Sequence, residues 1–302
     1  MAEALVLGTM YFGGRTDTAT SFALIDRFVE AGGRMLDTAN AYAFWAGGSG
    51  LSETAIGEWL RANPGADIEV ASKVGMTPAG DGVEGLGADI VRRELVGSLD
   101  RLGLDRLDVY WAHGEDRSTP DEEVVETFGA LVQEELVGRI GLSNHPTWRV
   151  ERMRMLAQQR GLPEFDLLQL TTSYVEPRPG AHVEGKDHPY GFANLETADY
   201  LAAHPDVGLW AYSPLIQGAY DRDDRPLPPA YDHPATSARL AVLGEVAAEL
   251  GAKPGQVVLA WLLARGVRPI IGTSSIAQLD EAIEAAALTL SDDQRRRLDE
   301  PA

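Results

Sequence analysis

Residues 107–142 read LDVYWAHGEDRSTPDEEVVETFGALVQEELVGRIGL, and the order of their apolar and helical segments indicates the fold class. Residues 107–111 form a short apolar run rich in β-forming side chains, which is typical of a buried strand. Residues 120–135 show helical periodicity behind an acidic first turn, which the helix dipole favours. A second apolar run follows at 139–142. Strand, helix and strand in close succession predict a parallel sheet with helices packed on its faces.

The same alternation continues in both directions along the chain. Further strands are predicted at 5–9, 35–37, 68–72, 166–170, 208–212 and 267–271, and further helices at 18–31, 52–61, 88–102, 147–160, 194–203 and 277–286. Eight strand–helix units in a chain of this length predict an α/β protein with a (β/α)8 TIM barrel. A doubly wound sheet is the alternative, and the lack of a G-x-G-x-x-G motif after the first predicted strand weighs against it.

Some segments fall outside this regular repeat. They are a Pro-, His- and Gly-rich loop at 176–192, an Asp- and Pro-rich stretch at 221–234, and additional helical segments at 238–250 and 254–264. No shift in composition marks a second domain. We therefore expect one barrel domain over residues 1–302, with loop insertions and extra C-terminal helices.

The composition excludes several classes of protein. The 302 residues include 26 Lys and Arg against 46 Asp and Glu, which gives a formal net charge of −20. Such an acidic chain repels phosphate backbones and anionic lipids, so neither nucleic acid nor a membrane surface is an expected partner. A chain without cysteine has no disulfide, thiolate nucleophile or sulfur-ligated zinc. The start does not resemble a signal peptide and no apolar run has membrane-spanning length, so we expect a soluble, cytoplasmic protein.

Four polar residues lie at or just beyond the carboxyl ends of consecutive predicted strands: Asp37 and Tyr42, then Lys73, then His113. Barrel enzymes form their active sites at this end, and neighbouring strands are about 4.8 Å apart, so these side chains should converge. A lysine ammonium beside Tyr42 is expected to lower the pKa of its phenol and make it a usable proton donor. Asp37 would hold Lys73 in place, and His113 would orient a carbonyl oxygen or help to relay the proton.

Six motifs in this order resemble the aldo-keto reductase family. They are LDTANAY (36–42), ASKVG (71–75), VYWAH (109–113), GLSN (141–144), AYSPL (211–215) and GTSSIAQLDE (272–281). The resemblance implies a barrel that binds NADPH or NADH without a Rossmann fold. It also implies reversible hydride transfer between the nicotinamide and an aldehyde, ketone or alcohol. Tyr42 is the general acid and base by this resemblance, and Asp37, Lys73 and His113 complete the family's tetrad.

The resemblance also implies a cofactor site. The expected contacts are Thr9 and Met10 at the end of the first strand, Ser143, Asn144 and Gln169 at the nicotinamide carboxamide, Tyr212 on the nicotinamide ring, Ser213 and Leu215 at the pyrophosphate, and Gly272, Ser274, Ser275, Gln278 and Glu281 near the adenosine. Many NADPH-dependent relatives have an arginine or lysine in the last segment, where this chain has Gly272, Thr273 and Ser274. Because some relatives bind NADPH through a similar Ser-Ser…Gln arrangement, we expect NADP, with NAD as the alternative.

The substrate is expected to be a small carbonyl or alcohol compound. The residues expected to wall its site are Phe12, Phe44, Trp45 and Trp111. Polar side chains in the 176–192 loop, namely His182, Lys186, His188 and Tyr190, suit a hydroxylated compound such as a sugar-derived ketone. The histidines of this loop, with His204 and His233, do not have the spacing of a helical metal-binding pair, so we expect no metal.

Two other functions stay open from the sequence. The same barrel could be a nicotinamide-binding regulatory subunit with little turnover, and tight cofactor binding without catalysis would favour it. A lyase or aldolase could use Lys73 as a Schiff-base nucleophile. The motifs of the cofactor site weigh against this last function.

Overall fold

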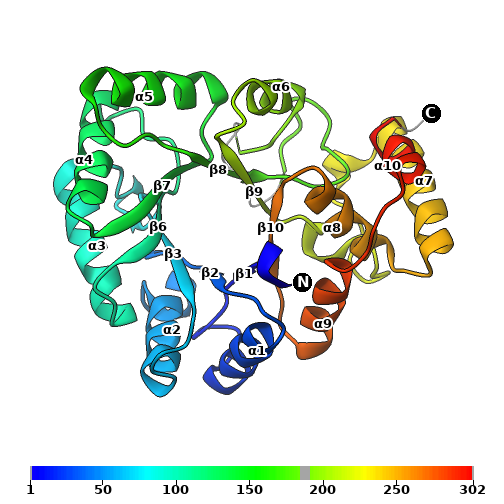
Figure 1. Ribbon diagram of the computed structural model, residues 1–302, viewed down its shortest axis with the longest axis horizontal. Coiled ribbons are helices and arrows are strands. Elements are labelled where there is room, and N and C mark those ends of the chain that lie inside the picture. The colour runs from blue at the N-terminus through cyan, green and yellow to red at the C-terminus, as the bar shows by residue number, and fades with distance from the viewer. Residues whose placement is uncertain (1, 184–190, 301–302) are drawn as a thin grey trace.

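The computed structural model describes residues 2–183 and 191–300, and a closed barrel of parallel strands forms its centre (Figure 1). The barrel strands are β1 (Val6–Gly8), β2 (Met35–Asp37), β3 (Glu69–Val74), β6 (Leu107–Ala112), β7 (Val137–Ser143), β8 (Leu167–Thr171), β9 (Gly208–Tyr212) and β10 (Arg268–Gly272). Their order around the barrel is β1-β10-β9-β8-β7-β6-β3-β2. The prediction of a (β/α)8 TIM barrel is confirmed, and every predicted strand overlaps an observed one.

The helices surround this barrel (Figure 1). They are α1 (Thr18–Glu30), α2 (Leu51–Ala62), α3 (Ala88–Leu102), α4 (Asp121–Gln133), α5 (Thr147–Arg160), α6 (Leu195–Ala203), α7 (Pro234–Leu250), α8 (Pro254–Ala264), α9 (Ile276–Ala285) and α10 (Asp292–Asp299). Short 3-10 helices occur at Ala2–Ala4, Phe44–Ala46, Ile216–Gly218 and Pro229–Tyr231. A small hairpin of β4 (Pro78–Ala79) and β5 (Gly82–Val83) lies in the loop between β3 and α3.

Side-chain caps explain where several helices begin. The Asp17 carboxylate accepts a hydrogen bond from the Thr20 N–H and caps α1, because the first N–H groups of a helix have no partner inside it. Ser275 caps α9 by accepting from the Gln278 N–H. Ser291 does the same for α10.

Two apolar layers stabilise the fold, because alternate residues of a barrel strand point inward and outward. The inner layer is a separate cluster of strand residues, in which the Trp111 and Trp210 rings lie 5.2 Å apart. The larger outer layer lies between strands and helices, and Phe28 and Phe128 are among its fully buried side chains. The inner layer fills the interior of the barrel, so the polar residues at its carboxyl-end face lie next to closely packed apolar side chains.

The observed elements differ from the predicted ones mainly in the irregular segments. Helix α4 ends at Gln133, earlier than predicted, and Glu135 has a left-handed φ of 62°. Helix α7 begins at Pro234 inside the stretch predicted to be irregular, because proline is well suited to the first turn of a helix. Neither α10 nor the β4–β5 hairpin was expected.

Candidate active site

The four predicted catalytic residues meet at the carboxyl-end face of the barrel. Asp37 ends β2, Lys73 lies near the end of β3, and His113 follows β6. These three strands are neighbours in the barrel, and Tyr42 lies in the loop that leaves β2. The chain thus brings together residues 76 positions apart in the sequence because consecutive strands pair side by side.

The Lys73 ammonium is the centre of this cluster. It is completely buried and donates to Asp37 Oδ2 at 2.5 Å, to the Thr38 carbonyl at 2.8 Å and to Tyr42 Oη at 2.9 Å. Burial alone would lower the pKa of Lys73, but the facing Asp37 and Tyr42 oxygens outweigh it and raise that pKa. Lys73 therefore stays protonated at neutral pH. The second oxygen of Asp37 accepts from Gln169 Nε2 at 3.1 Å.

The Tyr42 hydroxyl corrects one expectation from the sequence. Burial raises the pKa of Tyr42 above its ordinary value, although the Lys73 ammonium acts in the opposite direction. The expected lowering of this pKa is wrong for the site without ligands, because desolvation of a phenolate outweighs one nearby positive charge. At neutral pH the phenol keeps its proton and can donate it.

His113 lies beside Tyr42, with the two rings 5.8 Å apart and nearly perpendicular at 76°. Burial, and next the positive charge of Lys73, hold the pKa of His113 well below its ordinary range, so its imidazole is neutral at neutral pH. Within the described residues, His113 Nδ1 is buried and has no hydrogen-bond partner. Its carbonyl accepts from Asn144 Nδ2 at 2.9 Å, which joins this residue to the next part of the site.

Amide and hydroxyl groups line the ends of β7 and β8. Ser143 ends β7 opposite Gln169 of β8, and the Asn144 N–H donates to the Gln169 carbonyl at 3.2 Å. Asn144 has a left-handed φ of 58°, which asparagine tolerates better than most residues. The Tyr212 hydroxyl donates to Asn144 Oδ1 at 2.6 Å. Burial raises the pKa of Tyr212 to about 12, so this hydroxyl keeps its proton.

Gly191 lies directly against this group. A Cβ atom on Gly191 would come within 2.7 Å of Asn144 Oδ1 and 3.1 Å of Tyr212 Oη, so a larger residue would displace one of them. The Gly191 carbonyl also accepts from the Thr171 N–H at 2.7 Å, which fixes this end of the loop. Lys186, His188 and Tyr190, to which we assigned substrate contacts, lie outside the described residues.

The other predicted cofactor residues lie in the loops after β1 and β9 and in the segment from the end of β10 into α9. Thr9 is buried and donates to the Asp37 carbonyl at 2.9 Å, whereas Met10 is exposed. Ser213 has a left-handed φ of 53°, and Leu215 packs against the outer apolar layer. Gly272 ends β10, Ser274 donates to Gln278 Oε1 through its N–H and its hydroxyl, and Ser275 caps α9. The Glu281 carboxylate accepts from Lys253 Nζ at 2.5 Å.

The four aromatic residues predicted to wall the substrate site lie in two different environments. Phe44 and Trp45 are 46% and 40% exposed in the loop that follows Tyr42. Phe12 and Trp111 are fully buried, Phe12 in the outer apolar layer and Trp111 in the inner one. Contact of these two rings with a substrate stays a prediction, because both fill packed layers in this structure.

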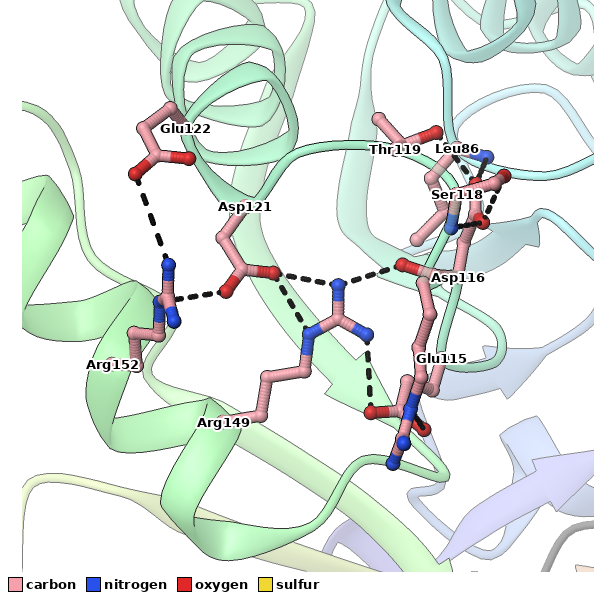
Figure 2. Close-up of polar contacts among 10 residues, drawn as sticks. Leu86, Glu115, Asp116, Ser118, Thr119, Asp121, Glu122, Arg149 and Arg152 are labelled. Carbon is pink, nitrogen blue, oxygen red and sulfur yellow. Dashed lines mark hydrogen bonds and ion pairs between the residues drawn. The ribbon is translucent and has the colours of Figure 1, made fainter.

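The sequence analysis missed the polar network that holds the loop after His113 (Figure 2). Arg149 of α5 donates to the Asp116 carbonyl at 2.6 Å and to Asp121 Oδ1, and its third nitrogen lies 3.1 Å from Glu115 Oε1. The Asp116 carboxylate accepts from Leu86, Ser118 and Thr119. Burial alone would raise the pKa of Asp116, but these hydrogen bonds hold it well below its ordinary range.

One signal could have identified this network from the sequence. Arg149 is the third residue of α5, where the helix dipole disfavours a positive charge. A buried arginine in that position requires acidic partners from elsewhere in the fold, and α4 with the β6–α4 loop supplies them. The network therefore ties the loop after His113 to the helix that follows Asn144.

Across residues 2–183 and 191–300, no helix combines the length and the apolar character that a membrane span requires.

Comparisons with known proteins agree with this architecture. The family model described as "Aldo/keto reductase family" matches residues 4–302. The chain is 32% identical over 316 residues to the uncharacterized oxidoreductase YrpG of Bacillus subtilis (strain 168), which covers 98% of this chain and 91% of the relative. It is 30% identical to the norsolorinic acid reductase stcV of Emericella nidulans over 96% of this chain and 76% of the relative. It is 28% identical to the aryl-alcohol dehydrogenase GME11368 of Pestalotiopsis microspora, with coverages of 95% and 75%.

Proposed function

The chain belongs to the Aldo/keto reductase family, and we propose that it is an NAD(P)H-dependent enzyme that reduces an aldehyde or ketone to an alcohol, or catalyses the reverse reaction. One observation carries the proposal. The buried Lys73 ammonium bridges Asp37 Oδ2 and Tyr42 Oη at the carboxyl-end face of the barrel. When a phenol gives its proton to a carbonyl oxygen, negative charge develops on the phenol oxygen. An ammonium held in this position stabilises that charge.

The residues of the site divide the proton chemistry between them. Tyr42 is protonated at neutral pH and gives its proton to the oxygen of the substrate carbonyl. Lys73 lies 2.9 Å from that hydroxyl and offsets the charge that remains on it. Asp37 holds Lys73, and the neutral imidazole of His113 orients the carbonyl oxygen beside Tyr42. A neutral histidine suits this role because it adds no second positive charge next to Lys73.

The donor set at the ends of β7, β8 and β9 fits a nicotinamide ring. Asn144 and Gln169 carry amides that can pair with a carboxamide, Ser143 adds a hydroxyl, and Tyr212 offers an aromatic face beside them. A bound reduced nicotinamide would supply the hydride for the carbonyl carbon, and the cofactor would be oxidised in the exchange. The segment with Ser274, Gln278 and Glu281 would hold the adenosine end. Our proposal is NADP, with NAD as the alternative.

The structure argues against the lyase alternative, whereas it does not separate the regulatory barrel from an enzyme. A Schiff-base lyase needs a neutral, accessible lysine amine, whereas Lys73 is completely buried and has a raised pKa. A regulatory barrel with little turnover would have the same cofactor site, and kinetics separate it from an enzyme.

The sugar-derived substrate and the cytoplasmic location stay predictions. The aryl-alcohol dehydrogenase among the relatives supports an aromatic compound as the substrate instead.

The test pairs cofactor binding with turnover. We expect NADPH or NADH to quench the tryptophan emission of the purified protein with micromolar affinity. We also expect cofactor-dependent reduction of simple aldehydes. Tyr42→Phe should keep the cofactor affinity and lose about 10²- to 10⁴-fold in kcat, the usual contribution of general acid catalysis. Tyr200→Phe, on helix α6, is the matched control and should keep full activity.

Each outcome has one meaning. Turnover of Tyr42→Phe above about a tenth of the wild-type kcat, a loss under ~1.4 kcal/mol, would overturn the assignment of Tyr42. Cofactor binding without turnover of any aldehyde, ketone or alcohol would support the regulatory barrel. No binding of either cofactor to the folded protein would refute both.

A further inference from the structure

The loop between β1 and α1 carries an exposed arginine, Arg15, in a hydrogen-bonded turn at the carboxyl-end face. The Tyr11 carbonyl accepts from the Gly14 N–H at 3.2 Å and from the Thr16 N–H at 2.9 Å, which closes a tight turn around Arg15. The buried ring of Phe12 anchors this turn in the outer apolar layer. The protein's own hydrogen bonds and the buried Phe12 ring thus hold the turn that carries Arg15.

Arg15 extends over exposed aromatic rings. Its guanidinium carbon lies 5.1 Å from the centre of the Tyr11 ring and 5.9 Å from that of Trp45. The Trp45 ring in turn makes edge contacts with Tyr11 and Phe44. At these distances a guanidinium is attracted to the faces of the rings, which holds it without using its N–H groups. We call Tyr11, Phe44, Trp45 and Arg15 the aromatic platform.

Within the described part of the chain, no carboxylate pairs with Arg15. The acidic residue closest to it in the sequence, Asp17, accepts from the Thr20 N–H at 2.7 Å and is used as the cap of α1. Other exposed arginines, such as Arg61 and Arg225, also have no ion pair among the described residues. What distinguishes Arg15 is the pair of aromatic rings beside its guanidinium. Its planar set of N–H donors fits a carboxylate or a similar anion.

The aromatic platform adjoins the residue that we propose as the proton donor. Phe44 and Trp45 follow Tyr42 within three residues, in the same loop. The turn before Arg15 packs on this loop, because a Cβ atom on Gly14 would lie 3.2 Å from the Ala43 Cβ and 3.4 Å from the Ala46 Cβ. A ligand whose carbonyl meets Tyr42 therefore has exposed rings and one cation at the edge of its site.

From this arrangement we propose that the substrate is an aromatic aldehyde or ketone that carries an anionic group such as a carboxylate. Its ring contacts Phe44 and Trp45, and its anion accepts hydrogen bonds from Arg15. The inference rests on the proposed carbonyl reduction and adds to it the class of substrate. Hydride from the reduced nicotinamide and the proton of Tyr42 convert its carbonyl to an alcohol, and the anionic group takes no part in the bond changes.

The experiment compares two aldehydes of nearly identical shape and different charge. They are 4-carboxybenzaldehyde, which is an anion at neutral pH, and 4-carbamoylbenzaldehyde, which is neutral. We expect the wild-type kcat/KM to favour the anion at least 10-fold, and added salt to reduce this ratio. Arg15→Gln should bring the ratio to about 1, and Arg15→Lys should retain part of it. Trp45→Ala should lower kcat/KM for both aromatic aldehydes relative to butanal.

Arg106→Gln is the matched control, because Arg106 is exposed just before β6, at the opposite end of the barrel strands. It should leave every ratio unchanged. Equal kcat/KM values for the two aldehydes in the wild type, or a ratio that Arg15→Gln does not change, would overturn the proposal.

Binding separates this proposal from the proposed function. Titration of the tryptophan emission with each aldehyde reports affinity whether or not turnover occurs. If the protein reduces no aldehyde but binds the carboxylate more tightly in an Arg15-dependent manner, the anion site is supported and the reaction is refuted. If it reduces aldehydes without any preference for the anion, the reaction is supported and the anion site is refuted.

Discussion

Removal of the Lys73 ammonium should destabilise the fold in a manner that depends on pH. In Lys73→Met the buried Asp37 carboxylate loses its partner at 2.5 Å, and among the described residues it keeps the hydrogen bond from Gln169 alone. Removing one member of a buried ion pair typically costs about 3–5 kcal/mol, because an uncompensated charge remains in the interior. At about 1.6 °C per kcal/mol for a chain of 302 residues, the melting temperature should fall by roughly 5–8 °C.

The pH dependence follows from Asp37. Without the ammonium, the folded-state pKa of Asp37 lies further above its unfolded value, since burial already raises it with Lys73 in place. A group with a raised folded pKa contributes stability that is present at low pH and lost as the pH rises through that pKa. The loss of unfolding free energy in Lys73→Met should therefore be larger at pH 8 than at pH 5. The double variant Asp37→Asn with Lys73→Met removes the charge and should recover most of the loss at pH 8.

Calorimetry at pH 5 and pH 8 on the wild type, both single variants and the double variant tests this reasoning. The four proteins form a double-mutant cycle, which isolates the coupling between the two side chains. The reasoning is refuted if Lys73→Met is as stable as the wild type at pH 8. It is also refuted if the double variant is no more stable than Lys73→Met at that pH.

Two further predictions concern packing around the site. Arg149→Met should lower stability by about 3–5 kcal/mol, because the buried carboxylates of Glu115 and Asp121 lose a partner, whereas the matched change at the exposed Arg152 should cost about 0–1 kcal/mol. Thermal unfolding checks both, and equal losses would contradict the network. Gly57→Ala should destabilise α2 by about 1–3 kcal/mol, because its Cβ would come within 2.1 Å of the Arg101 carbonyl, whereas Gly244→Ala in α7 has open space and should stabilise the protein by about 0.5–1 kcal/mol. Thermal unfolding measures both glycine variants, and an unchanged melting temperature of Gly57→Ala would show that α2 and α3 can move apart to make room for the methyl group.

The sequence predicts the barrel well because most strand residues are buried on both faces and the strands are therefore mainly apolar. The positions of Asp37 and Lys73 follow from the same pattern, since polar residues at the ends of such strands can only lie at the face of the barrel. Helix α10 has a single buried residue, Leu298, so it shows almost no apolar periodicity. Its capping box, Ser291 with Gln294, was the available signal.

Other features depend on distances that a sequence does not contain. The direction of the Tyr42 pKa shift is set by a balance between burial and the charge of Lys73, and motif spacing supplies only the second. The environments of Phe12 and Trp111 depend on which side of the backbone each ring takes. Residues of one chemical type therefore divide between packed layers and the exposed face.

The packed inner layer has a consequence for the supply of protons. Trp111 and Trp210 pack against each other inside the barrel, in a layer whose other members are apolar strand residues. Such a layer gives a proton few polar groups to move along. Tyr42 instead lies in a loop at the carboxyl-end face, beside Lys73 and His113. We therefore expect the proton that Tyr42 gives to a substrate to be replaced from the face at which the substrate binds.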